Sequence, residues 1–318
     1  MNLLITSAGR RVSLVRFAQK TLKHFDSASR VHAIDMVPEL SAACHIADYS
    51  AKAPRVTTDN YGQFLLEYCQ SHNITIILPT IDTELSILAG LKELFAKKGI
   101  TIIVSDQSLC ETFYLKSSTF DFFQTNGFKT PWIMTDLLTC QYPLFAKLDN
   151  SSCSIGATKV ESISAAQSLQ TSNERYVFQE LIIGEEYTVD FYLSREHVPI
   201  MIIPRKRLEV RAGEVSKSVT CKDDTIIDTV KQLSKSLQGG WGPMTLQLFK
   251  TQSNQLFLIE INPRVGGGYP LSFHAGMDIF QLILLEALGE KLEYNDTWEN
   301  NLMMLRYDDE VLVHGHRI

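Results

Sequence analysis

The sequence predicts a chain of mixed fold class, α/β in its first third and α+β in the remainder. Three observations lead to this prediction. Short apolar runs alternate with helical patterns up to about residue 105, whereas later apolar runs mostly follow one another with turns between them. Hydrophobic residues make up 45% and charged residues 21% of the 318 residues, an ordinary globular balance. The length indicates two or three structural units rather than one small domain.

The first third is predicted to form a parallel sheet with helices on both faces. Apolar runs predict strands at residues 3–5, 31–35, 74–78 and 100–104. Thr6-Ser-Ala-Gly-Arg10 forms the turn after the first strand, and a helix carrying Val12, Val15 and Phe17 follows it. Between the last two strands, leucines recur at helical spacing at positions 85, 88, 91 and 94. This βαβ rhythm favours parallel strand pairing.

The pattern changes after about residue 107. Residues 112–126 are predicted to form a helix that ends at Asn126-Gly127, a helix stop signal. Strands are predicted at 143–147, 176–181, 186–193, 198–203, 244–249 and 256–261, the last two joined by a hairpin. The remaining predictions are a polar loop over 205–222, helices over about 224–237 and 276–288, and closing strands at 302–307 and 311–314. Antiparallel sheets are therefore expected here.

Composition disfavours several classes of protein. The formal net charge of −6 argues against a broad nucleic-acid surface. No apolar run approaches the roughly 18 residues that span a bilayer, and Arg10 and Arg11 come too early for a secretory signal. The six cysteines include no CxxC pair, which argues against a zinc site and a disulfide framework. A soluble cytoplasmic protein with no membrane or nucleic-acid partner is the simplest interpretation.

The segment Glu260-Ile-Asn-Pro-Arg264 is the strongest chemical motif. It ends an apolar strand and precedes Gly266-Gly-Gly268. Residues two apart on a strand face the same side, so Glu260, Asn262 and Arg264 project together. A carboxylate and an amide oxygen suit Mg²⁺, and an arginine beside them can neutralise a phosphoryl group. Gln247 on the preceding strand can place a second amide oxygen opposite Glu260. A solvated strand face is the alternative, which the flanking apolar runs and the glycines disfavour.

Two further segments are consistent with nucleotide binding, although each can also be explained as ordinary protein surface. Residues 178–190 join an apolar connector to Gly184-Glu-Glu186, which suits an adenosine pocket; taken alone, a solvent-facing turn is the better interpretation. Lys147 ends a strand just before the small-residue loop 149–156, whose backbone N–H groups can cradle phosphates, and Lys116 lies one helix earlier. Either lysine alone is more often a surface charge.

A basic stretch lies inside the predicted polar loop, at Arg205, Lys206, Arg207 and Arg211. It is either a flexible loop over a charged substrate or a solvated loop, and both remain open. Substrate selection is expected from the loops at 6–11, 79–84, 205–220 and 264–274. The single glycine in Thr6-Ser-Ala-Gly-Arg10 disfavours a dinucleotide-dependent oxidoreductase, which would use G-x-G-x-x-G.

Taken in order, these motifs resemble the ATP-grasp superfamily, and most closely a single synthetic unit of the carbamoyl phosphate synthetase large subunit, in a short stand-alone form. Similarity covers almost the whole chain, including Ile77-Leu-Pro-Thr-x-Asp-x-Glu84. The resemblance implies an ATP-grasp fold whose two α+β subdomains clasp ATP. Its predicted parts are a Rossmann-like pre-ATP-grasp domain over 1–107, a small subdomain with the lysine helix and phosphate loop over 108–177, and a C-terminal subdomain with the metal site over 178–318.

The resemblance also implies roles for individual residues. Lys116 and Lys147 contact the nucleotide phosphates, and Ser152 and Ser154 belong to the mobile phosphate loop. Adenine is lined by Glu180, Leu181, Ile182 and Ile183, and Glu186 holds the ribose. Gln247, Glu260 and Asn262 bind Mg²⁺ or Mn²⁺, while Arg264 and Lys147 are the catalytic pair. Candidates for the substrate pocket are Gly9, Arg10, Thr80, Asp82, Glu84, Arg205, Arg207 and Arg211.

The implied activity is that of an ATP-dependent ligase. It activates a carboxylate as an acyl phosphate, which an amine or related nucleophile then attacks; a homodimer is the candidate assembly. Carbamoyl phosphate synthesis itself is not expected, because the second unit, the allosteric domain and the glutamine-hydrolysing partner are missing. The phosphate loop has fewer glycines than many relatives, which motivates an alternative: an ATP-binding regulatory or scaffold protein that keeps the fold without turnover.

Overall fold

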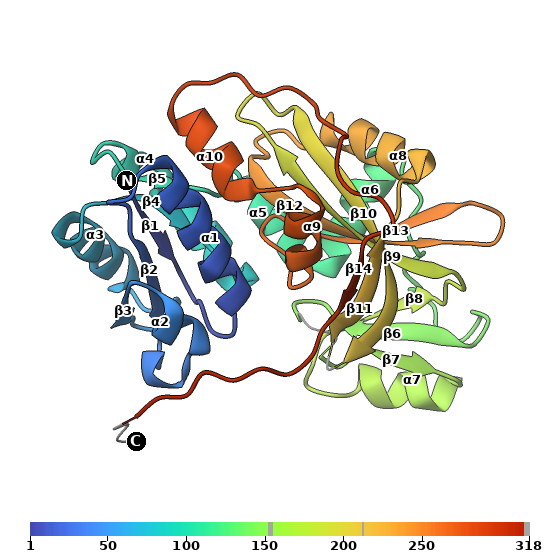
Figure 1. Ribbon diagram of the computed structural model, residues 1–318. Coiled ribbons are helices and arrows are strands. Elements are labelled where there is room, and N and C mark those ends of the chain that lie inside the picture. The colour runs from blue at the N-terminus through green and yellow to red at the C-terminus, as the bar shows by residue number, and fades with distance from the viewer. Residues whose placement is uncertain (152–154, 212, 315–318) are drawn as a thin grey trace.

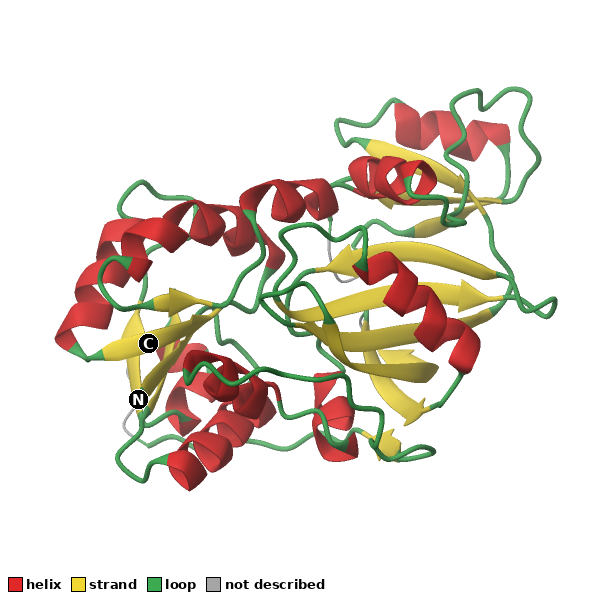
Figure 2. Ribbon diagram, turned by 90° about the horizontal axis from the view of Figure 1, so that it is seen from above, coloured by secondary structure: helices red, strands yellow, loops and turns green. Residues whose placement is uncertain are grey.

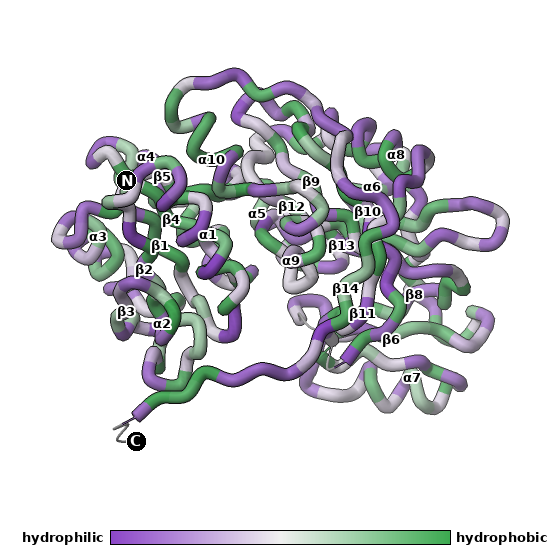
Figure 3. Tube along the Cα trace, viewed as in Figure 1, coloured by the Kyte–Doolittle hydropathy of each residue, from purple (hydrophilic) through white to green (hydrophobic). Residues whose placement is uncertain are grey.

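The computed structural model describes residues 1–151, 155–211 and 213–314. Its front third is a five-stranded parallel sheet in the order β3-β2-β1-β4-β5 (Figure 1). The strands are β1 Asn2–Ile5, β2 Val31–Asp35, β3 Tyr49–Lys52, β4 Ile74–Leu78 and β5 Thr101–Ile102. Hydrophobic residues dominate β1 and β4 in the middle of this sheet (Figure 3). The predicted parallel sheet is confirmed, although β5 is shorter than expected.

Helices cover both faces of the front sheet, as predicted. One face packs against α1 Val12–Phe25 and α2 Ala42–Ile46, which follows the 3₁₀ turn η1 Pro38–Leu40. The other face packs against α3 Tyr61–Ser71 and α4 Asp82–Ala96. The carboxyl ends of β1 and β4 therefore meet at one edge, where the loops 6–11 and 79–84 lie side by side. That edge of an open parallel sheet is where ligands usually bind.

The helix predicted over 112–126 is two helices, α5 Gln107–Tyr114 and α6 Lys116–Thr125. Leu115 between them is extended, at φ −103° and ψ 139°. The break exposes the first amides of α6 to Asp149, whose carboxylate accepts from the Ser117 N–H at 2.8 Å and whose carbonyl accepts from the Lys116 N–H at 2.9 Å. A tertiary partner thus caps α6, and it brings Lys116 close to the loop that follows Lys147.

A small three-stranded antiparallel sheet comes next, in the order β7-β6-β8. Its strands are β6 Leu144–Leu148, β7 Thr158–Val160 and β8 Tyr176–Glu180, and α7 Ile163–Gln170 packs on them. Its core is separate from the rest of the protein and consists of Leu137, Leu144, Ala146, Val160, Ala166 and Phe178. Because β8 pairs with β6 as far as Glu180, this sheet extends past the boundary predicted at residue 177.

The C-terminal part is built on a six-stranded antiparallel sheet in the order β13-β12-β9-β10-β11-β14. Its strands are β9 Glu185–Leu193, β10 Pro199–Arg211, β11 Glu214–Thr220, β12 Gly242–Lys250, β13 Leu256–Asn262 and β14 Met303–Leu305. The helices of this part are α8 Asp224–Ser234, α9 Tyr269–Ala275 and α10 Ile279–Ala287. Figures 1 and 2 show the parallel and the six-stranded sheet in separate halves of the molecule.

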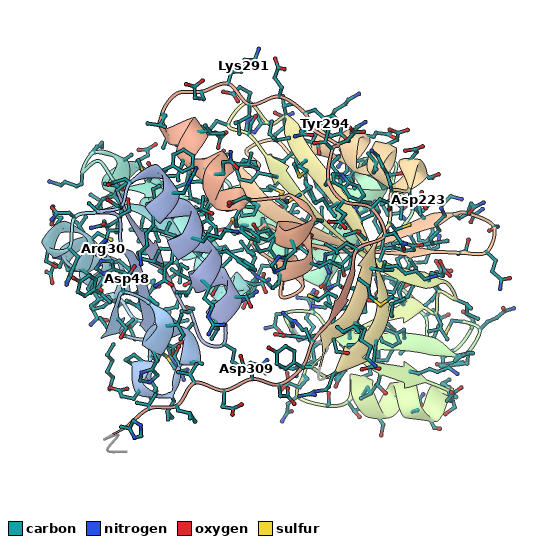
Figure 4. All side chains as sticks on the ribbon, viewed as in Figure 1. Arg30, Asp48, Asp223, Lys291, Tyr294 and Asp309 are labelled. Carbon is teal, nitrogen blue, oxygen red and sulfur yellow. The ribbon has the colours of Figure 1, made fainter. Side chains whose placement is uncertain are left out.

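Three secondary-structure predictions are wrong here. Residues 205–220 are not a polar loop, because they complete β10 and form β11, a hairpin whose charged side chains pair across strands, as in Lys217–Glu209 at 2.7 Å. The helix α9 was not predicted. Residues 311–314 form no strand; they lie on the C-terminal segment that runs from β14 towards the front domain and carries Asp309 (Figure 4).

One hydrophobic core joins the front sheet to the C-terminal sheet. Phe17 of α1 stacks on Phe273 of α9 with ring centroids 3.8 Å apart, and the Thr21 hydroxyl donates to the Asp278 carboxylate at 2.5 Å. These two halves therefore pack as a continuous body, with the small sheet attached to it. No helix in the described part of the chain is long and apolar enough to cross a membrane.

Candidate active site

A cavity of about 490 Å³ lies where the front domain, the small sheet and the six-stranded sheet meet. A second cavity of about 410 Å³ adjoins it at the carboxyl edge of the front sheet. Both are lined by the same group of residues at their junction: Arg11, Asp82, Thr83, Glu214, Arg264, Gly266 and Gly267. The arrangement can hold one extended ligand in the first cavity and a second ligand next to its end.

Strand register places a row of polar residues across the floor of the first cavity. Glu260 of β13 pairs with Gln247 of β12, Gln247 pairs with Thr188 of β9, and Thr188 pairs with Arg205 of β10. Directly paired residues face the same side of a sheet, and all four line the cavity. The predicted meeting of Gln247 with Glu260 is therefore present.

The metal-ligand candidates form one end of a chain of contacts that crosses to the front domain. The Asn262 side chain donates to the Glu260 carboxylate at 3.2 Å, and Arg264 donates to the Asn262 amide oxygen at 3.2 Å. Arg264 then donates to both carboxylate oxygens of Asp82, at 2.7 and 2.5 Å. One carboxylate and two amide oxygens fit a hard divalent cation that takes its remaining ligands from phosphates and water.

The two predicted phosphate-binding lysines both line the first cavity. Lys147 lines its wall, and burial lowers the pKa of the ammonium, while the Glu260 carboxylate opposes the shift. Lys116 lines the cavity and donates to the Ser151 carbonyl oxygen. The predicted loop residues Ser152 and Ser154 lie outside the described residues.

The connector after β8 forms the apolar end of the cavity. Leu181 and Ile182 line it together with Phe145, Phe249 and Ile259. Ile183, also predicted to line adenine, does not line the cavity and is 82% exposed.

The two glutamates of the connector are both engaged. Glu180 lines the cavity while its carboxylate accepts the Trp132 N–H at 3.0 Å. Glu186 also lines the cavity and forms an ion pair with Arg207, and burial raises the pKa of its carboxyl group.

Most of the front-domain candidates line the second cavity: Gly9, Arg10, Thr80 and Asp82. Glu84 is an exception. It is fully buried, and its carboxylate accepts from the Thr80 N–H at 2.7 Å and the Ser7 hydroxyl at 2.9 Å. It lines neither cavity, in contrast to its predicted position in the substrate pocket, and it holds the two loops together.

The three arginines of the basic stretch have different environments. Arg205 and Arg207 line the first cavity, since residues two apart on β10 share a face. Arg211 is exposed, pairs with Asp308 at 2.7 Å and lines neither cavity. Arg211 therefore lies away from both cavities, in contrast to its predicted position in the substrate pocket.

Several cavity residues were not predicted. Arg11 lines both cavities and donates to the Gly266 carbonyl at 3.0 Å; burial and the nearby Arg264 lower its pKa to about 10. Glu214 accepts from Arg10 at 3.4 Å and from Arg306 at 3.2 Å, which closes the outer side of the second cavity. Arg10, Glu214 and Arg306 lie far apart in the sequence, so only the fold shows that Glu214 pairs with both arginines. The pairing of Thr188 with Gln247 could have been found from strand register.

Comparisons with known proteins identify two domains in the chain. Residues 3–103 match the family model of the PylC-like N-terminal domain, and residues 115–268 match the ATP-grasp domain. None of the curated proteins matches the chain. Among solved structures, the biotin carboxylase domain of Hydrogenobacter thermophilus 2-oxoglutarate carboxylase, in complex with MgADP, ADP and bicarbonate, aligns with a TM-score of 0.71 at 14% identity, over 95% of this chain and 73% of that one.

Two other solved structures are similar to the same extent. N5-carboxyaminoimidazole synthetase from Staphylococcus aureus, complexed with ADP, aligns with a TM-score of 0.72 at 17% identity, over 92% of this chain and 78% of that one. The L-amino acid ligase from Bacillus licheniformis aligns with a TM-score of 0.67 at 17% identity, over 90% and 74%. The TM-scores show a shared fold. The chain therefore joins a PylC-like N-terminal domain to an ATP-grasp domain.

Proposed function

We propose that this protein is an ATP- and Mg²⁺-dependent ligase that activates a carboxylate as an acyl phosphate for attack by an amine or related nucleophile. The observation that carries the proposal is the pairing of Gln247 with Glu260 in the first cavity, beside Asn262 and Arg264, of which Arg264 also lines the second cavity. This arrangement supports phosphoryl transfer between a nucleotide in the first cavity and an acceptor in the second.

Each group contributes through position and charge. The apolar connector at Leu181 and Ile182 receives adenine, and Lys116 and Lys147 lie along the phosphates. Gln247, Glu260 and Asn262 would hold Mg²⁺, which when bound neutralises phosphate charge and orients the terminal phosphoryl group. Arg264, fixed by Asp82, stabilises negative charge that develops on that group. Catalysis of this kind needs no nucleophilic side chain.

The finer details rest on resemblance. Similarity to a synthetic unit of carbamoyl phosphate synthetase supports the roles given to Gln247, Glu260 and Asn262. The solved structures with this fold include a biotin carboxylase domain with bicarbonate and an L-amino acid ligase, so small carboxylates and amines are the substrate classes to test first. A homodimer through the front domain is the proposed assembly; the biotin carboxylase domain above is described as a dimer.

The test is ADP formation from MgATP across a panel of small carboxylates, each with and without amines. Turnover with at least one pair is expected. Glu260→Ala should lower that turnover by about 10²-fold or more, because a metal ligand is removed. Glu209→Ala is the matched control, since Glu209 lies on β10 but is exposed and pairs with Lys217.

Two outcomes would contradict the proposal. Tight MgATP binding without ADP release for any pair in the panel would instead support the binding-only alternative. Unchanged turnover in Glu260→Ala would remove the metal assignment.

A further inference from the structure

Arg205 combines complete burial with unused hydrogen-bonding capacity. Its side chain has no exposed surface, yet it lines the first cavity. Its Nε donates to the Asp190 carboxylate at 2.9 Å. Its two terminal nitrogens, Nη1 and Nη2, have no hydrogen-bond partner among the residues that the structure describes. Buried donors are almost always paired, so this exception calls for a ligand that the protein itself does not supply.

The surrounding contacts fix which edge of the guanidinium is free. Asp190 is 3% exposed and also accepts from the Thr245 hydroxyl at 3.1 Å and the Ser272 hydroxyl at 2.6 Å. Both carboxylate oxygens are therefore occupied, and the carboxylate cannot turn to take a second donor from Arg205. The end of the guanidinium that carries Nη1 and Nη2 remains, a planar edge with two parallel N–H groups.

The glycine loop Gly266-Gly-Gly268 lies directly against this pair. A Cβ atom added to Gly268 would overlap Arg205 Nη1, and one added to Gly266 would come within 2.7 Å of the Thr245 hydroxyl. Only glycines can approach this closely. Because Nη1 and Nη2 have almost no accessible surface, a ligand reaches them only when the glycine loop shifts.

The pairing of strands sets where Arg205 lies relative to the metal-ligand candidates. Arg205 belongs to the same row as Gln247, with Thr188 between them. Two strand spacings correspond to about 10 Å between the backbones, and both side chains face the cavity. The guanidinium of Arg205 lies against Asp190 and Gly268, and Gly268 follows the two glycines that line both cavities. A group bound at its free edge would therefore lie near the junction of the two cavities.

We propose that the Nη1–Nη2 edge of Arg205 binds the carboxylate group of the substrate, a subsite that deepens the proposed ligase function and rests on it. A carboxylate is planar and presents two oxygens to two parallel N–H groups. Lys116 and Lys147 already serve the phosphates, whereas Arg207 pairs with Glu186 and Arg211 with Asp308. Arg205 is then the arginine of the basic stretch that selects an anionic substrate.

The test uses variants that separate charge from geometry. Arg205→Lys keeps the charge and loses the planar edge. Arg205→Met combined with Asp190→Asn removes both charges together, so that no unpaired carboxylate is left buried. The matched control is Arg195→Lys, because Arg195 stacks 4.3 Å from the Trp241 ring and lines neither cavity. Thermal unfolding checks that each variant folds.

Formate, the smallest carboxylate, is the probe. It is titrated calorimetrically into the full chain saturated with MgADP, at constant ionic strength. The double variant is expected to weaken formate binding by about tenfold or more and Arg205→Lys by several-fold, while the dissociation constant for MgADP changes by less than about twofold. Arg195→Lys should leave both constants unchanged.

The possible failures are distinguishable. If MgADP itself does not bind to the wild-type chain, the proposed function fails. If MgADP binds but formate does not, or if formate binds equally well to a folded Arg205 variant, the Arg205 subsite is overturned while the ligase proposal stands. With any carboxylate that is turned over, Arg205→Lys should raise the KM for the carboxylate and leave the KM for ATP unchanged, a split that a purely structural role would not produce.

Discussion

Lys147 shows how a single residue can trade stability for ligand binding. It lies in the wall of the first cavity, and burial is the main cause of its lowered pKa; the Lys116 charge adds to the shift, and the Glu260 and Glu186 carboxylates oppose it. Nucleotide phosphates would supply the negative charge that the site lacks. We propose that the buried ammonium favours ligand binding at the expense of the stability of the ligand-free protein.

Replacing Lys147 by Met should stabilise the ligand-free protein at neutral pH, on the order of 1 kcal/mol, because a poorly solvated charge is removed. Between its lowered folded pKa and the ordinary lysine value of about 10.4, the unfolded chain holds more protons, so wild-type stability rises with pH in that window. The advantage of the variant should shrink as pH rises through it. Urea unfolding of both proteins at several pH values measures this.

The same substitution should weaken MgADP binding by about tenfold or more, or about 1.4 kcal/mol. Lys159→Met is the control: Lys159 is exposed and pairs with Glu161, so neither stability nor binding should change appreciably. A Lys147 variant that is less stable than wild type at neutral pH, or whose stability difference is the same at every pH, would show that the ammonium is well solvated.

Asp82 illustrates a residue role that no sequence pattern indicated. Its predicted position near the acceptor pocket is consistent with the second cavity, but its carboxylate holds the Arg264 guanidinium through two hydrogen bonds. A carboxylate at the start of α4 thus orients the arginine that follows β13, across 182 positions of sequence. The motif that contains Asp82 predicted that this residue lies near the site. Its pairing with Arg264 depends on how the front domain packs against the C-terminal part.

At the scale of elements, strands with mostly apolar residues could be predicted from the sequence, whereas strands with many charged residues could not. The strands at 31–35 and 74–78 have the predicted bounds, because segments rich in apolar residues favour buried positions in a parallel sheet. The hairpin β10–β11 was predicted as a loop since Arg205, Lys206, Arg207 and Arg211 read as solvated. Each has a tertiary partner instead, such as Lys206 with Glu185, and a single sequence does not show such pairs.

The glycine loop gives a prediction at this scale. Gly268→Ala should destabilise the protein by about 1–3 kcal/mol, because the new methyl group would overlap both the Arg205 guanidinium and Val215, whose side chain would lie 2.7 Å from the added Cβ atom. Its backbone conformation is ordinary, at φ −87°, so the cost is steric. Chemical denaturation of the ligand-free chain measures the change.

Gly90→Ala is the contrasting variant. Gly90 lies inside α4, its added Cβ would meet only the end of the Gln107 side chain at 3.4 Å, and alanine favours helix by about 1 kcal/mol. Stabilisation is therefore expected there. Equal effects of the two substitutions would mean that the glycine loop has room to move away from Arg205 in the ligand-free protein.

At the scale of the molecule, the cavity lies between two parts of the protein whose hydrophobic cores differ in size. The front sheet and the six-stranded sheet share one core through α1 and α9, whereas the small sheet has its own small core. The small sheet carries Lys147, and the six-stranded sheet carries Glu260. A nucleotide held between them would link the small sheet, with its smaller core, to the larger shared core.

Hydrogen exchange should therefore respond to MgADP in a localised way. Amides of β6 and β8 are expected to exchange about tenfold more slowly with MgADP, because binding energy is added to the local opening of the small sheet. Amides of α3 should not change, since this helix lines neither cavity and its local opening leaves the nucleotide bound. In Glu260→Ala the protection of β6 and β8 should be smaller. Uniform protection along the chain would indicate that the small sheet opens only together with the rest, and the two parts would then be one.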